Sequence, residues 1–539
     1  MPATYTYPGV YVEEVPSGVH PVAGVTTSET AFVDYFSRGP MNVPKRVTSL
    51  AEFDRLFGGL DAKSEASYAI RHYFTNGGSA AWIVRVASGT GNDAAKAAAF
   101  TLKKGGTGGT DILEVDAASE GEWGGGLQVG VDTAGLPAGV FNLVVRELVT
   151  VGGAKQVVAS EVYRNLTMNP ADAAHYALNV VNPSSQLIQL VRKSQPSNTD
   201  PPDATSANAI TPSVIANADD STAFKPLTQG RNGNVPDRAA LKAGVEALDS
   251  IAPFVFNILC LPRASLLVGN DQAATDAAVK GAYEDALDYC RRKRAILLID
   301  PPSGVNDADA MTTWRNAAAK MPKPDPNAAL YWPRLNVADP LQGGLTKSIG
   351  ASGAVAGIFA RTDATRGVWK APAGTEAGVA GGALAAQVND AQQGNLNVLG
   401  INVLRTFPIF GNVVWGARTT MGADQAASEW KYLPVRRLAL YVEESLYQGL
   451  KWVVFEPNDE PLWAQIRLNV GSFMHQLYRQ GAFAGATPKD AYLVKCDKDT
   501  TTQADVDRGI VNILVGFLPL KPAEFVVLRI QQLAGQIET

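Results

Sequence analysis

The sequence is short of the residues that build metal centres and disulfide frameworks. Its 539 residues include three cysteines and four histidines, and no two of these seven lie close together. Structural zinc motifs need closely spaced ligands, and disulfide-rich folds need paired cysteines. The pattern therefore predicts no metal site, no disulfides, and folding in a reducing cytoplasm. The residues are Cys260, Cys290, Cys496, His20, His72, His175 and His475.

Motifs for phosphate binding and nucleophilic catalysis are absent as well. No Gly-Lys dipeptide occurs, which excludes a Walker-type loop. The run Gly105-Gly106-Thr107-Gly108-Gly109 lacks the G-x-G-x-x-G spacing of dinucleotide sites, so it predicts a turn. Ser352 follows Gly350-Ala351 without the spacing of a nucleophile elbow, and this stretch predicts a helix of small residues. We therefore expect no cofactor and no enzymatic activity.

Charge and hydropathy argue against a nucleic-acid-binding protein and against a protein with membrane-spanning helices. The net formal charge is −5, from 47 basic and 52 acidic residues, which gives no basic field for nucleic acid. No apolar run reaches the roughly 18 residues of a membrane-spanning helix. The N-terminus has neither the basic region nor the apolar core of a signal peptide, so secretion by that route is not expected.

One carboxylate keeps an enzymatic alternative open. Asp300 ends an apolar strand, which is where ligand sites gather in open α/β sheets. Asp307 and Asp309 follow nearby, and three such carboxylates are suited to a cation. The other interpretation is that the strand simply ends and an aspartate caps the next helix.

The two ends of the chain are its most informative part. The chain opens with Tyr7-Pro8-Gly9-Val10-Tyr11-Val12-Glu13-Glu14 and closes with Lys521-Pro522-Ala523-Glu524-Phe525-Val526-Val527-Leu528-Arg529-Ile530. Each is a short β-prone run introduced by a proline. Termini fray unless something ties them down, and an isolated strand pairs with a sheet edge of its own fold or of a neighbour. The ends therefore indicate a protein that links to copies of itself.

Between the ends, the pattern predicts a multidomain α/β and α+β fold. Helices alternating with apolar strands indicate a layered α/β domain whose parallel sheet is covered on both faces. Gly- and Thr-rich turns between strands indicate an inserted β-rich domain. The predicted parts are an arm over 1–24, a discontinuous central α/β domain over 25–90 and 230–424, an inserted domain over 91–229 with a flexible loop at 194–224, and a C-terminal α+β domain over 425–539.

Helix 461–480 of the C-terminal domain has a clear periodicity. Asp459 is placed to cap it, and Pro461 suits its first turn. Its apolar stripe is formed by Leu462, Ile466, Val470, Phe473 and Leu477. Its opposite, polar face carries Gln465, Asn469, Ser472, Gln476 and Arg479.

Together with four internal segments, the two ends resemble the tail sheath proteins of contractile phage tails and related contractile injection machines. The resemblance covers roughly residues 5–90 and 230–532, and it rests on the order and the amino-acid sequence of several segments. The internal segments are Ser49-Leu50-Ala51-Glu52-Phe53, Gly121-Glu122-Trp123-Gly124, the run from Trp430 to Leu450, and Gln503-Ala504-Asp505-Val506-Asp507.

The resemblance implies a structural subunit that stacks as six-fold rings around an inner tube and contracts by rigid-body rearrangement. Its two terminal arms would lend strands to the sheets of neighbours and so complete the C-terminal α+β domain. The implied partners are copies of itself, the inner tube protein, and baseplate and terminal cap proteins, with no nucleic acid and no direct membrane insertion. The implied arm residues are Val10, Tyr11, Val12, Glu13, Phe525, Val526, Val527, Leu528, Arg529 and Ile530, and the candidate tube-facing residues are Arg467 and Arg479.

The resemblance also implies a place in the cell and leaves two other functions as alternatives. We expect assembly in the cytoplasm, as part of a virion tail or a phage-tail-like particle, and release by lysis or by another route that needs no signal peptide. The inserted domain is expected to face outward. The alternatives are an α/β enzyme with a site near Asp300, and a self-assembling surface-layer protein, which would need an export signal.

Overall fold

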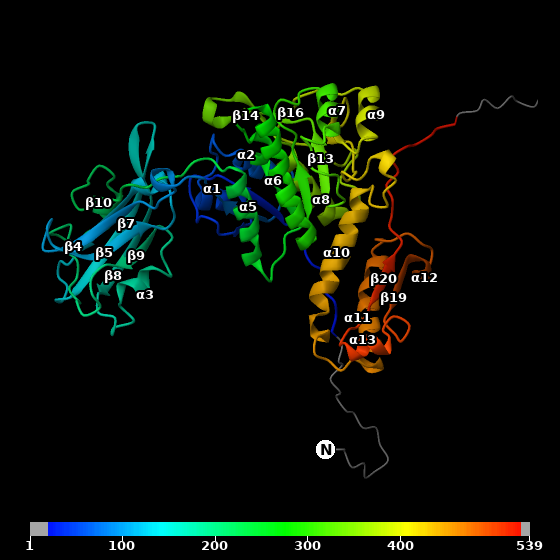
Figure 1. The fold of residues 1–539 in the computed structure, drawn as a ribbon. Helices are drawn as coiled ribbons and strands as arrows, with labels where there is room; N and C mark the ends of the chain where they lie inside the picture. The colour runs from blue at the N-terminus through cyan, green and yellow to red at the C-terminus, as the bar shows by residue number, and fades with distance from the viewer. Residues whose placement is uncertain (1–19, 530–539) are drawn as a thin grey trace, which may run out of the picture. The chain divides into compact units, whose positions relative to one another are not determined.

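The computed structural model describes residues 20–529 (Figure 1). The predicted arm residues Val10, Tyr11, Val12 and Glu13, and also Ile530, lie outside this range. The chain forms two compact units. The large unit comprises residues 27–365 and 371–433, and the small unit comprises residues up to 26, the short stretch 366–370, and residues from 434 onward.

An eight-stranded sheet lies at the centre of the large unit. Its strand order is β18-β17-β13-β12-β11-β1-β3-β2. The six inner strands are parallel, and β2 and β18 pair antiparallel at the two edges. The predicted parallel sheet is thereby confirmed. The strands are β1 (Thr30–Asp34), β2 (Lys45–Val47), β3 (Ala81–Arg85), β11 (Ile258–Cys260), β12 (Ile296–Ile299), β13 (Ala328–Trp332), β17 (Asn402–Phe407) and β18 (Gly411–Val414).

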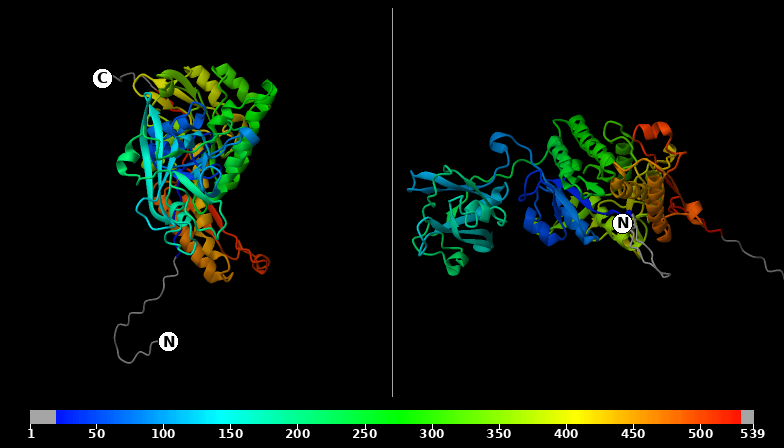
Figure 2. Two further views of the ribbon diagram at one scale, coloured as in Figure 1. Left: turned by 90° about the vertical axis from the view of Figure 1, so that its left-hand side faces the viewer. Right: turned by 90° about the horizontal axis from the view of Figure 1, so that it is seen from below.

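Helices cover both faces of this sheet, which explains why its inner strands are almost wholly apolar (Figures 1 and 2). One face packs against α5, α6, α7 and α9 in a single large core. On the other face, Phe32 of β1 packs edge-on against Tyr73 of α2, and Tyr331 of β13 packs edge-on against Phe359 of α8. The helices are α1 (Leu50–Phe57), α2 (Glu65–Thr75), α5 (Arg238–Ala247), α6 (Gln272–Lys293), α7 (Ala308–Asn316), α8 (Ser352–Arg366) and α9 (Asp390–Asn397). A small three-stranded sheet is formed by β14 (Leu335–Asp339), β15 (Leu345–Ile349) and β16 (Ala383–Leu384).

Local sequence sets where several helices begin. Ser49 caps α1 by accepting from the Glu52 amide, and Gly58 ends this helix in the left-handed region at φ 87°. The Glu52 carboxylate accepts from the amide and the hydroxyl of Thr48. Among residues 20–529 no helix is both long enough and apolar enough to cross a membrane.

The inserted segment carries two sheets over a core of its own. Strands β4, β5 and β9 form one sheet, and β10, β6, β7 and β8 form the other. The run Gly105–Gly109 is the turn between β4 and β5, whose strands the sequence did not indicate. A short helix, α3 (Ala177–Val181), precedes β9, and Asn169 and Asp172 hold turns just before it. The strands are β4 (Ala99–Lys104), β5 (Thr110–Ala117), β6 (Leu127–Asp132), β7 (Val140–Val151), β8 (Ala154–Thr167), β9 (Ile188–Arg192) and β10 (Lys225–Pro226).

Segment 194–224, predicted as a flexible loop, has little regular structure but is packed against the inserted sheet through Arg146. This buried guanidinium on β7 donates to the carbonyls of Ile215 and Asn217, beside the short helix α4 (Pro212–Ala216), and to that of Asp220. It also lies 3.8 Å from the ring centre of Phe224. Five donors in a rigid planar fork allow this one side chain to bind several carbonyls in a fixed geometry.

The small unit is built on two long helices, α10 (Leu433–Gly449) and α11 (Glu460–Arg479). Asp459 caps α11, and all five predicted stripe residues of this helix are buried. Asn469, predicted on its polar face, is buried as well. The remaining elements are α12 (Pro488–Ala491), α13 (Gln503–Asp507) and the antiparallel strands β19 (Tyr492–Lys495) and β20 (Leu514–Phe517).

The strand predicted at Phe525–Ile530 is not formed over its described residues. Residues 520–529 have no regular secondary structure. A single strand forms only when a partner supplies the other half of the hydrogen bonds, and β20 pairs with β19 instead.

Replacing Arg146 tests how segment 194–224 is held. Arg146→Met leaves several carbonyls without donors, so we expect the unfolding free energy to fall by about 1–3 kcal/mol and proteolysis within 210–224 to become faster. Urea unfolding and limited proteolysis measure the two effects. Arg164→Met on the exposed face of β8 is the control and should change neither. Unchanged cleavage in the Arg146 variant would contradict this account.

Candidate functional site

The large sheet has one topological switch point. The chain passes from β1 to β3 on one side, and returns to pair β11 with the other side of β1. In open α/β sheets, ligands bind outside the carboxyl ends of the strands at this point. The candidate site is therefore the region beyond the ends of β1, β11 and β12.

Asp34, the last residue of β1, fills the first position where a ligand would bind. Its carboxylate accepts from the Tyr35 amide at 2.7 Å and from the Ala66 amide at 2.8 Å. Ala66 lies in the first turn of α2, and free amides at a helix N-terminus are a ready anion site. Burial raises the pKa of Asp34 to about 7, against the opposing effect of the two amides. The protein's own carboxylate thus occupies this anion position.

Asp300, the predicted candidate, fills the equivalent position at α8. It accepts from the Ser352 amide at 2.9 Å and from the Ser352 hydroxyl at 2.5 Å, at the first residue of that helix. Burial raises its pKa. Ser352 is therefore a helix-start residue bound to a carboxylate, and it forms no part of a nucleophile elbow.

The structure does not join Asp300 to the two carboxylates that were predicted to lie near it for a cation. Asp307 accepts from the Ala310 amide at 2.8 Å and caps α7, as the capping interpretation proposed. Asp309 lies in the first turn of the same helix. Across residues 20–529, no group of three or more His, Cys, Asp or Glu side chains is arranged to hold a metal ion.

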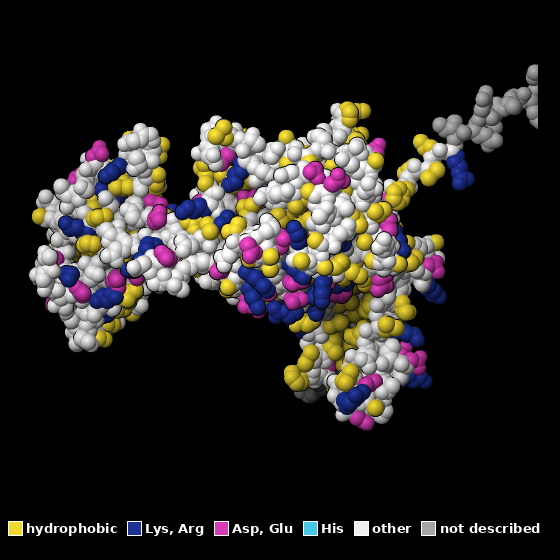
Figure 3. Space-filling model, turned by 45° about the horizontal axis from the view of Figure 1, so that its top comes forward, with side chains coloured by type: hydrophobic (Ala, Val, Ile, Leu, Met, Phe, Trp, Pro, Cys, Tyr) yellow, Lys and Arg dark blue, Asp and Glu magenta, His cyan; other side chains and the backbone are white. Residues whose placement is uncertain are grey.

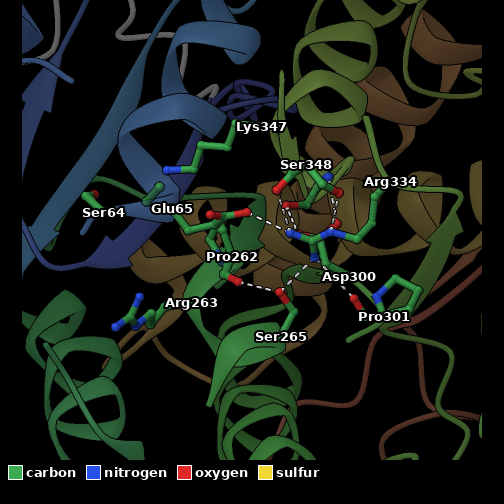
Figure 4. A network of polar contacts seen from close by, with 12 residues as sticks. Ser64, Glu65, Pro262, Arg263, Ser265, Asp300, Pro301, Arg334, Lys347 and Ser348 are labelled. Atoms are coloured by element: carbon green, nitrogen blue, oxygen red, sulfur yellow. Dashed lines mark hydrogen bonds and ion pairs between the residues drawn. The ribbon is translucent and has the colours of Figure 1, made fainter. Parts of the chain in front are cut away.

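Arg334 connects these segments at the same edge (Figure 4). It forms a 2.8 Å ion pair with Glu65, and the two side chains are only 3% and 4% exposed. It also donates to the Ser265 hydroxyl and to the Pro301 carbonyl. Sequence analysis missed this network, because its members lie up to 269 residues apart and share no motif.

The cysteines and histidines form no disulfide within the described residues. All three cysteines are free and buried, as expected from a small apolar side chain. Two of the histidines have polar neighbours. His175 lies 3.0 Å from Asp172, and His475 lies 3.2 Å from the Tyr492 hydroxyl.

The second candidate site is the sheet of the small unit. Within residues 20–529 this sheet has only the strands β19 and β20. Leu493 and Leu514, one on each strand, are exposed. The segment that follows exposes four consecutive apolar side chains, which lead toward the undescribed C-terminus (Figure 3). These are Phe525, Val526, Val527 and Leu528, with exposed fractions of 75% to 82%.

The two arginines predicted to face a partner have different surroundings. Arg467 is engaged inside the small unit, where it donates to the Cys496 carbonyl and forms a 2.6 Å ion pair with Glu460. Arg479 lies in the last turn of α11, and its side chain is exposed. Only Arg479 therefore presents an exposed charge on this helix without an ion pair that holds it in place.

The raised pKa of Asp34 gives the stability a defined pH dependence. From about pH 4 to pH 7 the folded chain holds a proton on this carboxyl that the unfolded chain releases. The unfolding free energy should therefore fall as pH rises through that window. Asp34→Asn does not titrate, so its unfolding free energy should fall less steeply over the same range. Denaturant unfolding at several pH values measures the slopes, and equal slopes would refute the assignment.

Two family models match this chain. The model of the phage tail sheath protein central domain matches residues 239–420. The model of the phage tail sheath C-terminal domain matches residues 425–532. The first match covers the part of the large unit from α5 to the residues just after β18, and the second covers the small unit from α10 onward.

Curated relatives agree with these matches over part of their lengths. A protein described as a prophage major tail sheath protein of Pseudomonas aeruginosa (strain UCBPP-PA14) is 25% identical over 247 residues, which is 45% of this chain and 59% of the relative. The tail sheath protein of Vibrio phage KVP40 is 28% identical over 180 residues, which is 33% of this chain and 26% of the relative. The matched region thus spans less than two thirds of either relative.

Solved structures share the fold over nearly the whole chain. The helical sheath of the anti-feeding prophage in its contracted state matches with a TM-score of 0.56 and 23% identity, and the match covers 98% of this chain and 100% of that one. A sheath tail protein of Listeria innocua matches with a TM-score of 0.57 and 12% identity, over 93% and 96% of the two chains. The two family models together cover more than half of the 539 residues, and the chain belongs to the phage tail sheath protein family.

Proposed function

We propose that this chain is the subunit of a contractile sheath. It polymerises as stacked six-fold rings around an inner tube, and the sheath contracts to drive the tube through a target envelope. Family membership supports the sheath assignment, and the fold shared with contracted sheaths of the anti-feeding prophage and of an extracellular contractile injection system supports the contractile one. The observation that carries the proposal is the exposed apolar segment Phe525–Leu528 next in sequence to an incomplete sheet.

A two-stranded sheet is marginal in water, whereas three or more strands with an apolar face are stable. The pair β19–β20 leaves backbone groups at both of its edges for strands from neighbouring subunits. The C-terminal segment 525–530 of one subunit and the arm around Val10–Glu13 of another are the proposed donors. Each added hydrogen bond contributes about 0.5–1.5 kcal/mol net, so a few per strand make a firm link that repeats along the sheath.

Contraction is then a rearrangement of packed bodies joined by paired strands. The strands stay paired while the folded units rotate and slide from one packing to another. The extended sheath is held behind a kinetic barrier, and the contracted sheath has the lower free energy. Firing of this kind consumes no nucleotide, in keeping with a chain that has no Walker-type loop.

The parts of the chain have distinct proposed roles. The inserted domain over 91–229 faces outward, and the C-terminal domain over 425–539 faces the tube. The baseplate and a terminal cap bound the sheath at its ends, and assembly takes place in the cytoplasm. Catalysis is not part of the proposal, because Asp34 and Asp300 occupy the helix N-termini where an α/β enzyme binds its ligand.

Removing two backbone donors tests strand lending directly. Val526→Pro with Val527→Pro deletes two consecutive N–H groups, one of which points toward the partner strand in any pairing. We expect this variant to form no tubes in negative-stain electron microscopy, with the unfolding free energy of the subunit unchanged. The control Val526→Thr with Val527→Thr keeps the β-branched shape and both donors, and should still assemble. Tubes of normal length from the proline variant would eliminate strand lending by this segment.

Charge reversal on α11 tests its proposed contact with the tube. Arg479→Glu should reduce the amount of sheath that assembles around the inner tube, because weak polar contacts there are steered by charge. Lys489→Glu makes the same charge change at another exposed position of the small unit and serves as the control. Co-sedimentation of sheath with tube at low and high salt measures the effect. Equal loss in both variants would argue against a specific role for Arg479.

A further inference from the structure

Residues 20–25 form an extended strap along helix α10, although the sequence gives no signal for it. These residues belong to the small unit by their contacts, and the first strand of the large unit, β1, begins only at Thr30. The strap contacts Tyr441, Ser445, Gly449 and Trp452. These positions are spaced 4, 4 and 3 residues apart, so they form one face of α10 and of the helical turn Lys451–Val453 that follows it.

The contacts are of three different kinds. His20 stacks on the Trp452 ring, with ring centres 4.3 Å apart and planes inclined by 20°. Val22 is buried in the core of the small unit together with Leu438 and Val442. The Val25 amide donates to the Ser445 hydroxyl at 3.2 Å.

Two glycines make this close approach possible. A Cβ on Gly24 would lie 2.0 Å from the Tyr441 hydroxyl, a distance that real Cβ atoms do not show. A Cβ on Gly449 would lie 2.8 Å from the nearest atom of the Val22 side chain. One glycine is on the strap and the other is on the helix, so the fit depends on small residues on both sides.

The strap follows the helix face along its own length. His20 contacts Trp452 at one end, Val22 contacts Gly449, and Val25 contacts Ser445 at the other end. The strap thus runs antiparallel to α10, and Figure 1 shows this blue segment beside the helix. A pull directed along the strap loads several of these contacts together.

We propose that this strap is the mechanical root of the N-terminal arm. It transfers a pull on the arm into α10 before the pull reaches β1, which lies in the middle of the large sheet. The small unit then bears the load of both terminal links, since the C-terminal segment also leaves from it. Gly24, Val22 and Gly449 are positioning residues for the arm. This role rests on the proposed function, in which the arm joins subunits.

Gly449→Ala is the informative variant. Alanine is a better helix former than glycine, so at an unobstructed helical position this change is neutral or favourable. Here the new methyl group displaces Val22. We expect hydrogen exchange at the Val25 amide of unassembled subunits to rise about tenfold or more, and tube formation to fall. Gly471→Ala on α11 is the matched control, because nothing lies within 4 Å of its added Cβ.

A covalent lock separates loss of the strap from damage to the fold. Val22→Cys with Gly449→Cys places two cysteines at neighbouring positions, while the three native cysteines are buried. When oxidised, this double variant should assemble as well as the wild type. The proposal is overturned if the oxidised chain fails to assemble while the reduced chain succeeds. It is also overturned if Gly449→Ala leaves Val25 exchange unchanged, or raises the exchange without reducing assembly.

The same assays distinguish this inference from the proposed function. If wild-type chains form no tubes in the presence of inner tube protein, and deletion of residues 1–19 changes nothing, the strand-linking function fails. Amide exchange in unassembled Gly449→Ala subunits still reports whether the strap is held on α10. A third outcome is that deletion of residues 1–19 abolishes the tubes, while Gly449→Ala shows normal Val25 exchange and normal assembly. That result supports the linking function of the N-terminal arm and overturns the proposal that the strap anchors it.

Discussion

The structure of the small unit depends on backbone hydrogen bonds that a single chain does not make. Within residues 20–529, β19 and β20 form a sheet of two strands, and the apolar segment Phe525–Leu528 that follows is exposed. Each is unfavourable in an isolated subunit, since a free strand and a free edge both lack partners. Pairing between copies removes both penalties together. This complementarity links the local structure of the C-terminal part to the polymer that we propose.

The large unit has the opposite character at its switch point, because the carboxylates there are bonded within the chain. Asp34 and Asp300 are bonded to the first turns of α2 and α8, and Arg334 is paired with Glu65. A doubly wound sheet offers its ligand site at this edge, yet here side chains of the protein fill it. In the small unit, the strap on α10 supplies the fixed point that we propose for the N-terminal arm.

Much of this architecture follows from local pattern. The alternation of apolar strands and helices predicted a parallel sheet covered on both faces, and the spacing of Leu462, Ile466 and Val470 predicted the buried face of α11. Helix starts at Asp307 and Asp459 were readable because a cap depends on residues three positions apart. The resemblance of the two ends and of several internal segments identified the family.

The sequence by itself determined the alternation of helices and strands in the large unit, the buried stripe of α11, the lack of cofactor motifs and the family. Only the tertiary structure decided that Asp300 binds Ser352, that Arg146 holds segment 210–224, and that Phe525–Arg529 lacks a partner within the described chain. It also decided that residues 20–25 lie on α10, about 420 residues away in sequence. The physical reason is the separation along the chain over which each effect acts. Periodicity and capping act over a few residues, whereas the partner of a buried polar group or of an extended segment is set by which distant elements pack together.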